Sequence, residues 1–269
     1  MAPAGAAGGA GLVTAMIFPP QLVDAVHAYP HPLVFATVSG AHLYGFPSVD
    51  SDWDLRGVHV LPLRDVLGLE TPEETHSLER DDGTVELDLV THDARKFARL
   101  LLTRNGYVLE QLLSPLVVHT MPAHADLAAL ARRCVTRHHA HHYLGFTRNQ
   151  WEMLEREDVP RVKPLLYAFR TVLTGLHLLR TGEVEANLEV LNAEARLPFL
   201  TDLMTLKREG REGEPLPEAP AVYQAEHLRL VRELEEARQT THLPDAVPDD
   251  VARAVSEWVV GVRLSSPAR

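Results

Sequence analysis

The chain has 269 residues, of which 45% are hydrophobic and 23% charged, and its 26 basic and 37 acidic side chains give a net charge of −11. This length allows one large domain or two small ones around a hydrophobic core, and the single cysteine, Cys134, excludes a disulfide framework and a four-cysteine zinc site. Because no run approaches about 18 apolar residues, we expect a cytoplasmic protein without a membrane partner, and the acidic balance argues against a protein that coats nucleic acid, although it allows a local basic groove.

The first 120 residues mix the signals of strands and helices. The Ala- and Gly-rich start predicts a flexible tail over residues 1–13. Arg80-Asp81-Asp82-Gly83 has the composition of a hairpin turn, and Asp93 is expected to cap a helix over 94–102. Alternating or β-branched apolar runs predict three strands, at 33–38, 55–61 and 84–90.

Beyond Pro122 the periodicity is helical throughout. The breaks at Pro and Gly clusters predict six helices, at 123–142, 145–157, 163–181, 198–207, 219–239 and 249–262. The fold class is therefore expected to be α+β, with an N-terminal mixed-sheet domain over 14–120 and a C-terminal all-helical domain over 121–269.

The most informative segment is Val38 to Arg56, VSGAHLYGFPSVDSDWDLR. A glycine turn follows the first strand, and Asp52 and Asp54 open the next, where residues two apart project to the same side. Such carboxylates repel each other unless a cation lies between them, so a divalent ion is the natural occupant. If the later strand that carries Asp88 is a neighbour, three acids converge and suit two Mg²⁺ ions about 3.5–4 Å apart that clamp a phosphoryl transfer.

This pattern resembles the signature of the DNA polymerase beta superfamily of nucleotidyltransferases. In that superfamily a glycine-serine turn precedes paired acids and a third acid follows. The chain looks most similar to bacterial predicted nucleotidyltransferases that include a group associated with RNA ligases and RNA repair. NGYVLEQLLSP at 105–115 fits a further element of these proteins, and 163–182 is similar to a helical segment that follows their core. The resemblance is strong over 34–115 and implies a polymerase-beta-like catalytic domain.

The resemblance also implies roles for individual residues. Asp52 and Asp54 would bind two ions together, Mg²⁺ or Mn²⁺, and Asp88 would hold the ion at which an acceptor hydroxyl is deprotonated. The glycine turn would cradle the phosphates of a nucleoside triphosphate, with Ala41 in place of the family's serine. The candidate nucleotide-binding residues of this segment are Ser39, Gly40, Ala41, His42, Ser51 and Arg56.

Several of these side chains also have a plain structural interpretation. Arg56 is at least equally suited to be a counter-ion for the acids, and His42 to be an ordinary turn residue. Lys163, Tyr167 and Arg170 share one face of a predicted helix. They either line the triphosphate, with Tyr167 stacked on the base, or form a solvated stripe.

The histidine-rich segment after Cys134 has helical ligand spacing. Cys134, His138 and His142 would nevertheless span about 12 Å on one straight helix, so they are not expected to close around a zinc ion. A solvated or groove-facing helix is the better interpretation. A further alternative is that these histidines line an acceptor channel, where partial protonation attracts a phosphate backbone.

We expect the chain to be an enzyme that transfers a nucleoside monophosphate from an NTP such as ATP to an acceptor hydroxyl and releases pyrophosphate. The resemblance suggests an RNA end as acceptor, which requires a local cluster of basic residues, with Arg95, Lys96, Arg99, Arg104 and Lys163 as candidates. Two alternatives stay open. One is AMP transfer to a protein or small-molecule hydroxyl, and the other is a non-catalytic, nucleotide-sensing or antitoxin-like module.

Overall fold

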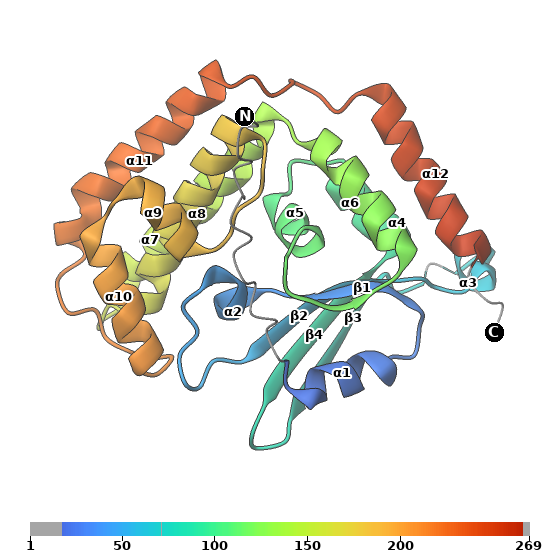
Figure 1. Cartoon of the computed structure of the whole chain (residues 1–269), viewed down its shortest axis with the longest axis horizontal. Helices are drawn as coiled ribbons and strands as arrows, with labels where there is room; N and C mark the ends of the chain where they lie inside the picture. The colour runs from blue at the N-terminus through green and yellow to red at the C-terminus, as the bar shows by residue number, and fades with distance from the viewer. Residues whose placement is uncertain (1–17, 71, 266–269) are drawn as a thin grey trace, which may run out of the picture.

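A computed structural model describes residues 18–70 and 72–265, so the tail predicted over 1–13 lies outside the described residues. The strands are β1 (Leu33–Val38), β2 (Trp53–His59), β3 (Thr75–Asp81), β4 (Glu86–Asp93) and β5 (Val117–Thr120). They form one sheet in the order β3-β4-β2-β1-β5 (Figure 1). β2 and β4 run parallel and the other neighbours antiparallel, so the expected mixed sheet of an α+β fold is confirmed.

Helices cover both faces of this sheet, as Figure 1 shows. All six residues of β1 are buried, because Leu22 of α1 (Pro20–His27) belongs to the core on one face and Phe97 of α4 (Ala94–Leu101) to the core on the other. Asp93 caps α4 as predicted, since its carboxylate accepts from the N–H of Arg95 at 2.9 Å. The remaining helices of this part are short: α2 (Gly40–Tyr44), α3 (Leu63–Leu67) and α5 (Gly106–Leu112).

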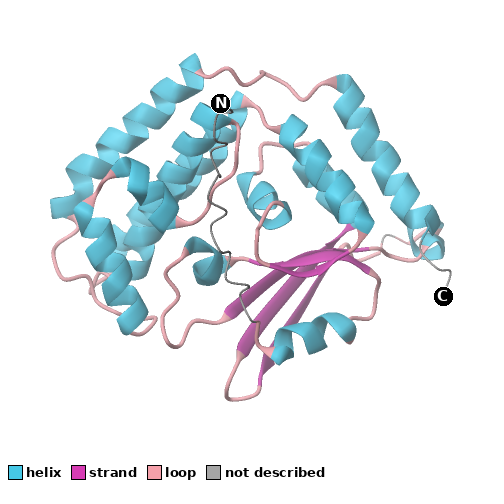
Figure 2. Ribbon diagram, in the orientation of Figure 1, coloured by secondary structure: helices cyan, strands magenta, loops and turns pink. Residues whose placement is uncertain are grey.

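The second half of the chain is helical (Figure 2). Its elements are α6 (Pro122–Cys134), the 3₁₀ turn η1 (Arg137–His139), α7 (Ala140–Arg156), α8 (Val162–Thr181), α9 (Leu188–Ala195), α10 (Pro198–Glu209), α11 (Ala221–Thr240) and α12 (Asp249–Ser265). α8 is the central helix, with α7, α9, α10 and α11 packed around it. None of the helices in the described residues is long and apolar enough to cross a membrane.

The last helix, α12, returns to the sheet and packs against α4 and α6. The guanidinium of Arg263 donates to the carboxylate of Asp93 at 2.5 Å and to the carbonyl of Leu61 at 3.0 Å. Both charged side chains are buried. This ion pair joins α12 to the end of β4, so packing crosses the predicted boundary at residue 121.

One predicted helix, 123–142, is wrong. α6 ends at Cys134, and Thr136 begins a new turn in which its N–H donates to His139 Nδ1 at 3.1 Å. The β-branched pair Val135-Thr136 favours this extended break, because a threonine side chain competes for the backbone as a cap. The helical spacing of Cys134, His138 and His142 is therefore interrupted.

The sequence pattern also missed two strands. β3 (THSLERD) alternates weakly and is largely exposed at the sheet edge, and β5 has only four residues. Short or polar edge strands derive their structure from their neighbours rather than from an apolar face. β3 forms a hairpin with β4 around the predicted turn and thereby brings β4 beside β2.

Acid is expected to destabilise the helical half through His227 of α11. This imidazole is buried, stacks on Trp151 at 4.2 Å and hydrogen-bonds Thr147 at 2.9 Å. Burial lowers its pKa to about 4, whereas the unfolded chain has the ordinary value of about 6.5. The unfolded state therefore binds the proton first, and the free energy of unfolding falls by roughly 1–2 kcal/mol between pH 7 and pH 5 on account of this residue.

Urea titrations of wild type and His227→Gln at pH 7 and pH 5 measure this effect. The wild type should lose more stability on acidification than the variant. Equal losses in both proteins would contradict the assignment.

Candidate active site

Two acids meet across the parallel strand pair at the centre of the sheet. Asp54 of β2 lies opposite Asp88 of β4, and Asp52 is the residue before β2. The predicted adjacency of the two strands is therefore confirmed. Burial raises the pKa of Asp54 above its ordinary value, Arg56 opposes this shift, and the negative charges of Asp52 and Asp88 raise the pKa further. All three acids thus contribute negative charge to one place.

The guanidinium of Arg56 lies between these acids. Its Nη2 donates to Asp54 Oδ1 at 2.5 Å and to Asp88 Oδ2 at 3.0 Å. Its Nη1 donates to the carbonyls of Leu55 and Asp88, both at 2.9 Å, and its Nε donates to the hydroxyl of Tyr107 at 3.0 Å. Of the two interpretations of Arg56, this geometry supports the counter-ion.

The turn after β1 fits tightly against Asp54. Gly40 has a φ of 62°, and a Cβ atom at this position would lie 1.9 Å from Asp54 Oδ2, so no other residue fits here. The N–H of Ser39 donates to the carbonyl of Asp54 at 2.8 Å. The hydroxyl of Ser39 is buried without a hydrogen-bond partner in the part of the chain described, and Ala41 is buried beside it. The turn and the acid are therefore one rigid unit.

His42 and Ser51 flank this unit. His42 stacks on Trp53, with ring centroids 3.7 Å apart, and burial lowers the pKa of its imidazole. Its Nε2 is buried and has no hydrogen-bond partner among the residues described. Ser51 Oγ accepts from the N–H of Ser48 at 2.9 Å, which stabilises the loop that leads into β2.

The donor set agrees with a divalent ion in kind but not in arrangement. Carboxylate oxygens are the ligands that Mg²⁺ and Mn²⁺ take. Asp54 nevertheless has one oxygen against Gly40 and the other on Arg56, which also holds Asp88. Across residues 18–70 and 72–265, no group of three or more His, Cys, Asp or Glu side chains is placed to hold a metal ion.

The first turns of α8 face the acids. The ammonium of Lys163 lies 5.7 Å from the ring centroid of Tyr167, and its charge lowers the pKa of Asp54. Tyr167 lies edge-on to Tyr44 of α2, with centroids 5.4 Å apart. Lys163 also forms an ion pair with Glu212, a residue that sequence reasoning did not single out. Two of the three residues predicted on this helix face are thus near the acids.

Arg170 is not a phosphate-facing cation, and it is not solvated either. Its guanidinium is 3% exposed, pairs with the buried carboxylate of Glu110 at 2.8 Å and lies 3.9 Å from the ring centroid of Tyr44. It joins α8 to α5 and α2. The spacing of residues on a helix face does not distinguish a buried ion pair from a ligand-binding surface, because both require the same residue types.

A second group that sequence reasoning missed anchors the loop before β2. Lys207 is completely buried, and its ammonium donates to Ser48 Oγ at 2.6 Å and pairs with Glu212. The N–H of Glu212 donates to Asp50 at 2.9 Å. No local signal identifies this lysine, because it lies in an otherwise ordinary amphipathic helix.

The predicted basic cluster is only partly available for an acidic partner. Arg95 and Arg99 both pair with Glu74, and Lys96 donates to Thr75. Arg104, in contrast, is exposed and forms no ion pair within the described residues.

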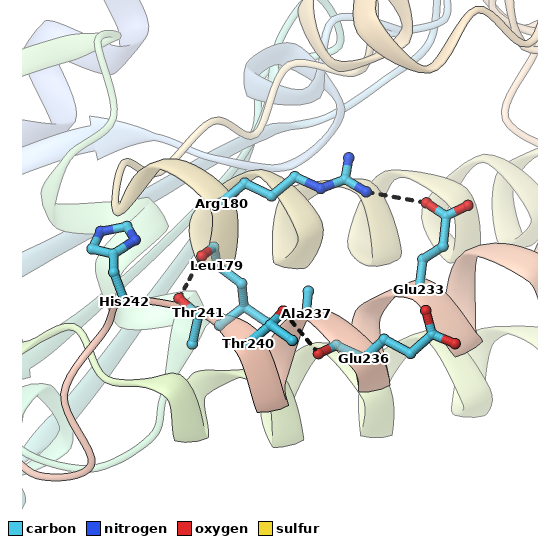
Figure 3. A pocket seen from close by; sticks show the side chains of 8 residues that line it. All are labelled: Leu179, Arg180, Glu233, Glu236, Ala237, Thr240, Thr241 and His242. Atoms are coloured by element: carbon cyan, nitrogen blue, oxygen red, sulfur yellow. Dashed lines mark hydrogen bonds and ion pairs between the residues drawn. The ribbon is translucent and has the colours of Figure 1, made fainter.

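A cavity between α8 and α11 is separate from the acids (Figure 3). Two pairs of its polar groups bond to each other: Arg180 with Glu233 at 3.1 Å, and the hydroxyl of Thr241 with the carbonyl of Leu179 at 2.5 Å. We assign it no role in the chemistry of the acids.

The chain is similar in sequence to two proteins of other organisms. The chain is 31% identical over 158 residues to protein MJ0002 of Methanocaldococcus jannaschii, an alignment that covers 57% of this chain and 63%, less than two thirds, of that protein. It is 26% identical over 222 residues to YcgL of Bacillus subtilis, covering 77% of this chain and 82% of that protein.

A crystal structure of a nucleotidyltransferase-like protein from Exiguobacterium sibiricum aligns over 90% of this chain and 77% of its own, with 13% identity and a TM-score of 0.32. The profile of the RlaP family, described as the RNA repair pathway DNA polymerase beta family, matches residues 19–260 and so contains the acids, Arg56 and α8. The chain therefore belongs to the RlaP family, the RNA repair pathway DNA polymerase beta family.

Proposed function

We propose that the chain transfers a nucleoside monophosphate from an NTP to the terminal hydroxyl of an RNA and releases pyrophosphate. The observation that carries this proposal is the in-register pair Asp54–Asp88, with Asp52 directly before the same strand and the charge of Lys163 acting on Asp54. Carboxylates at this spacing suit the binding of divalent ions, which would neutralise the charge of the transferring phosphoryl group, and a lysine suits the departing phosphates.

In this proposal the protein acts chiefly by positioning its substrates. The N–H groups of Gly40, Ala41 and His42 hold the phosphates, while the N–H of Ser39 fixes the turn on the carbonyl of Asp54. Lys163 neutralises the phosphates and Tyr167 contacts the base. Asp52, Asp54 and Asp88 are the proposed ligands of two Mg²⁺ or Mn²⁺ ions. When bound, such ions supply charge neutralisation at the transferring phosphoryl group.

The RNA end is favoured as acceptor by a group of arginines and histidine rings beyond the start of α5. Arg104 follows α4, and Arg238 of α11 contacts His141 at 3.0 Å. The ring of His138 stacks on that of His141 with centroids 5.9 Å apart. Burial, Arg238 and Arg104 all lower the pKa of His141, which reflects the gathering of positive charge. We name Arg104, His138, His141 and Arg238 the histidine–arginine surface.

This surface is connected to the acids through the start of α5. A Cβ atom on Gly106 would lie 2.9 Å from the ring of His142, which neighbours His141, and the hydroxyl of Tyr107 accepts from Arg56. Cations interleaved with stackable rings suit a single-stranded nucleic acid, whose bases stack and whose phosphates pair with arginine. This proximity supports the alternative of histidines along an acceptor channel, but the lowered pKa of His141 keeps its ring neutral near pH 7, so the rings would stack and the arginines would supply the charge.

The test offers each of the four NTPs, labelled on the α-phosphate, with Mg²⁺ or Mn²⁺ and an RNA that ends in a 3′ hydroxyl. The matched control is the same RNA with a 3′ phosphate. Label on the first RNA alone supports the proposal. Label on a protein or on a small molecule would mean that this molecule, and not RNA, is the acceptor. Nucleotide binding without any transfer would mean that the chain is a nucleotide-sensing module and not an enzyme.

Removing the two arginines of the histidine–arginine surface should weaken RNA use without affecting the nucleotide. Arg104→Gln/Arg238→Gln is expected to raise the KM for RNA about tenfold at moderate salt, with the KM for NTP unchanged. The slope of log KM against log salt should fall by about 1.4, since each lost phosphate contact on a single strand contributes about 0.7.

The control variant removes the same charge elsewhere. Arg132→Gln/Arg133→Gln on α6 breaks pairs with Glu183 and Asp250 on the surface. An equal rise in the KM for RNA in both variants would show that net charge, rather than this surface, governs binding.

A further inference from the structure

All donors of Arg56 are in use. A guanidinium has five N–H groups in a fixed planar fork. Those of Arg56 donate to the hydroxyl of Tyr107, the carbonyl of Leu55, the carbonyl and carboxylate of Asp88 and the carboxylate of Asp54. The side chain is 13% exposed. A side chain fixed at five points is a built element of the site and not a mobile surface cation.

Arg56 also uses the oxygens that a metal ion would need. A divalent ion binds carboxylate oxygen at about 2.0–2.2 Å and directs its charge at the same lone pairs that the guanidinium engages. The other oxygen of Asp54, Oδ2, lies in the narrow space beside Gly40, which only a glycine leaves open. An ion that bridges Asp54 Oδ1 and Asp88 Oδ2, the two oxygens that share Nη2 of Arg56, must therefore displace the guanidinium.

We propose that Arg56 is the resident cation of the acid pair, a positioning residue that a divalent ion must displace, so that the site binds bare metal weakly and is loaded by the metal–nucleotide complex. This inference rests on the proposed function, since it specifies how the same acids are occupied before the substrate arrives. Tyr107 serves as the anchor on which the guanidinium is oriented.

The charges explain why a nucleotide would favour the divalent ion over Arg56 in the competition for the two carboxylates. A bare divalent ion brings two positive charges towards the positive charge of Arg56, which repels it. A metal–nucleotide complex brings phosphate oxygens as well, and these give the displaced guanidinium a new acceptor.

The experiment measures Mn²⁺ affinity without nucleotide, by electron paramagnetic resonance and calorimetry at fixed ionic strength. Arg56→Gln should bind Mn²⁺ at least tenfold more tightly than wild type, because the competing charge is gone. Mn²⁺ should also raise the Tm of this variant more than that of wild type, since its acids repel each other in the apo state. Equal or weaker binding in the variant would overturn the inference.

Two further variants keep the test decisive. Tyr107→Phe retains the charge of Arg56 but removes its Nε anchor, and it should tighten Mn²⁺ binding two- to threefold; it carries the test if Arg56→Gln fails to fold. Arg95→Gln removes an arginine that pairs with Glu74 on the same sheet and should leave Mn²⁺ affinity unchanged. Transfer activity in wild type together with unaltered Mn²⁺ affinity in both test variants would overturn this inference and leave the proposed function intact.

Discussion

Asp54→Asn is expected to lower nucleotide transfer by about 10³-fold and to leave the fold unchanged. The substitution keeps the shape that fits against Gly40 and keeps an oxygen for Arg56. It removes the negative charge of Asp54, whose side chain is oriented by Gly40, by the neighbouring strand β4 and by the guanidinium of Arg56. Loss of one preorganised charged group at a phosphoryl-transfer centre has an effect of this size.

Single-turnover rates with saturating NTP measure the loss, and circular dichroism reports the fold. Asp50→Asn is the matched control, because it is the same chemical change in the same loop, where Asp50 accepts from the N–H of Glu212. It should retain activity within about threefold. Full activity in Asp54→Asn would remove this carboxylate from the mechanism.

Arg170→Met should lower the free energy of unfolding by about 3–5 kcal/mol. The substitution leaves the carboxylate of Glu110 buried and unpaired in the contact between α5 and α8, and desolvated charge without a partner is costly. It also removes the guanidinium that lies over the ring of Tyr44. Urea denaturation followed by tryptophan fluorescence measures the change.

The double variant Arg170→Met/Glu110→Leu separates charge from packing. Replacing both ions by apolar side chains of similar size should recover most of the lost stability, because neither charge then remains buried alone. A double variant as unstable as Arg170→Met would mean that shape, not charge pairing, holds these helices together.

The sequence pattern was most reliable where one physical rule dominated. The β-branched run at 33–38 is β1 to the residue, because a strand buried on both faces has no competing periodicity. The cap at Asp93 and the hairpin turn before β4 were also correct, since both depend on local side-chain chemistry. The paired acids followed from a motif, and their adjacency to Asp88 followed from the family pattern rather than from spacing.

What the sequence could not reveal depends on contacts between distant segments. The five contacts of Arg56 combine β2, β4 and α5, so no local window distinguishes it from any other arginine near acids. Lys207 and Glu212 meet a serine some 160 residues earlier in the chain. Edge strand β3 is too polar to show the alternating apolar pattern that predicts a strand. The break at Thr136 is hidden in the sequence because the residues on both sides of it have strong helical periodicity.

The buried pair Arg263–Asp93 has a consequence for the order in which the protein acquires its structure. Asp93 ends the strand that carries Asp88, and its partner is synthesised 170 residues later. Until α12 emerges from the ribosome, Asp93 can cap α4, but its carboxylate has no ion-pair partner because Arg263 is not yet present. The sheet can begin to form during synthesis, but Asp93, at the end of the acid-bearing strand, gains its buried cation only when the end of α12 docks, so a chain interrupted before that point would lack this ion pair.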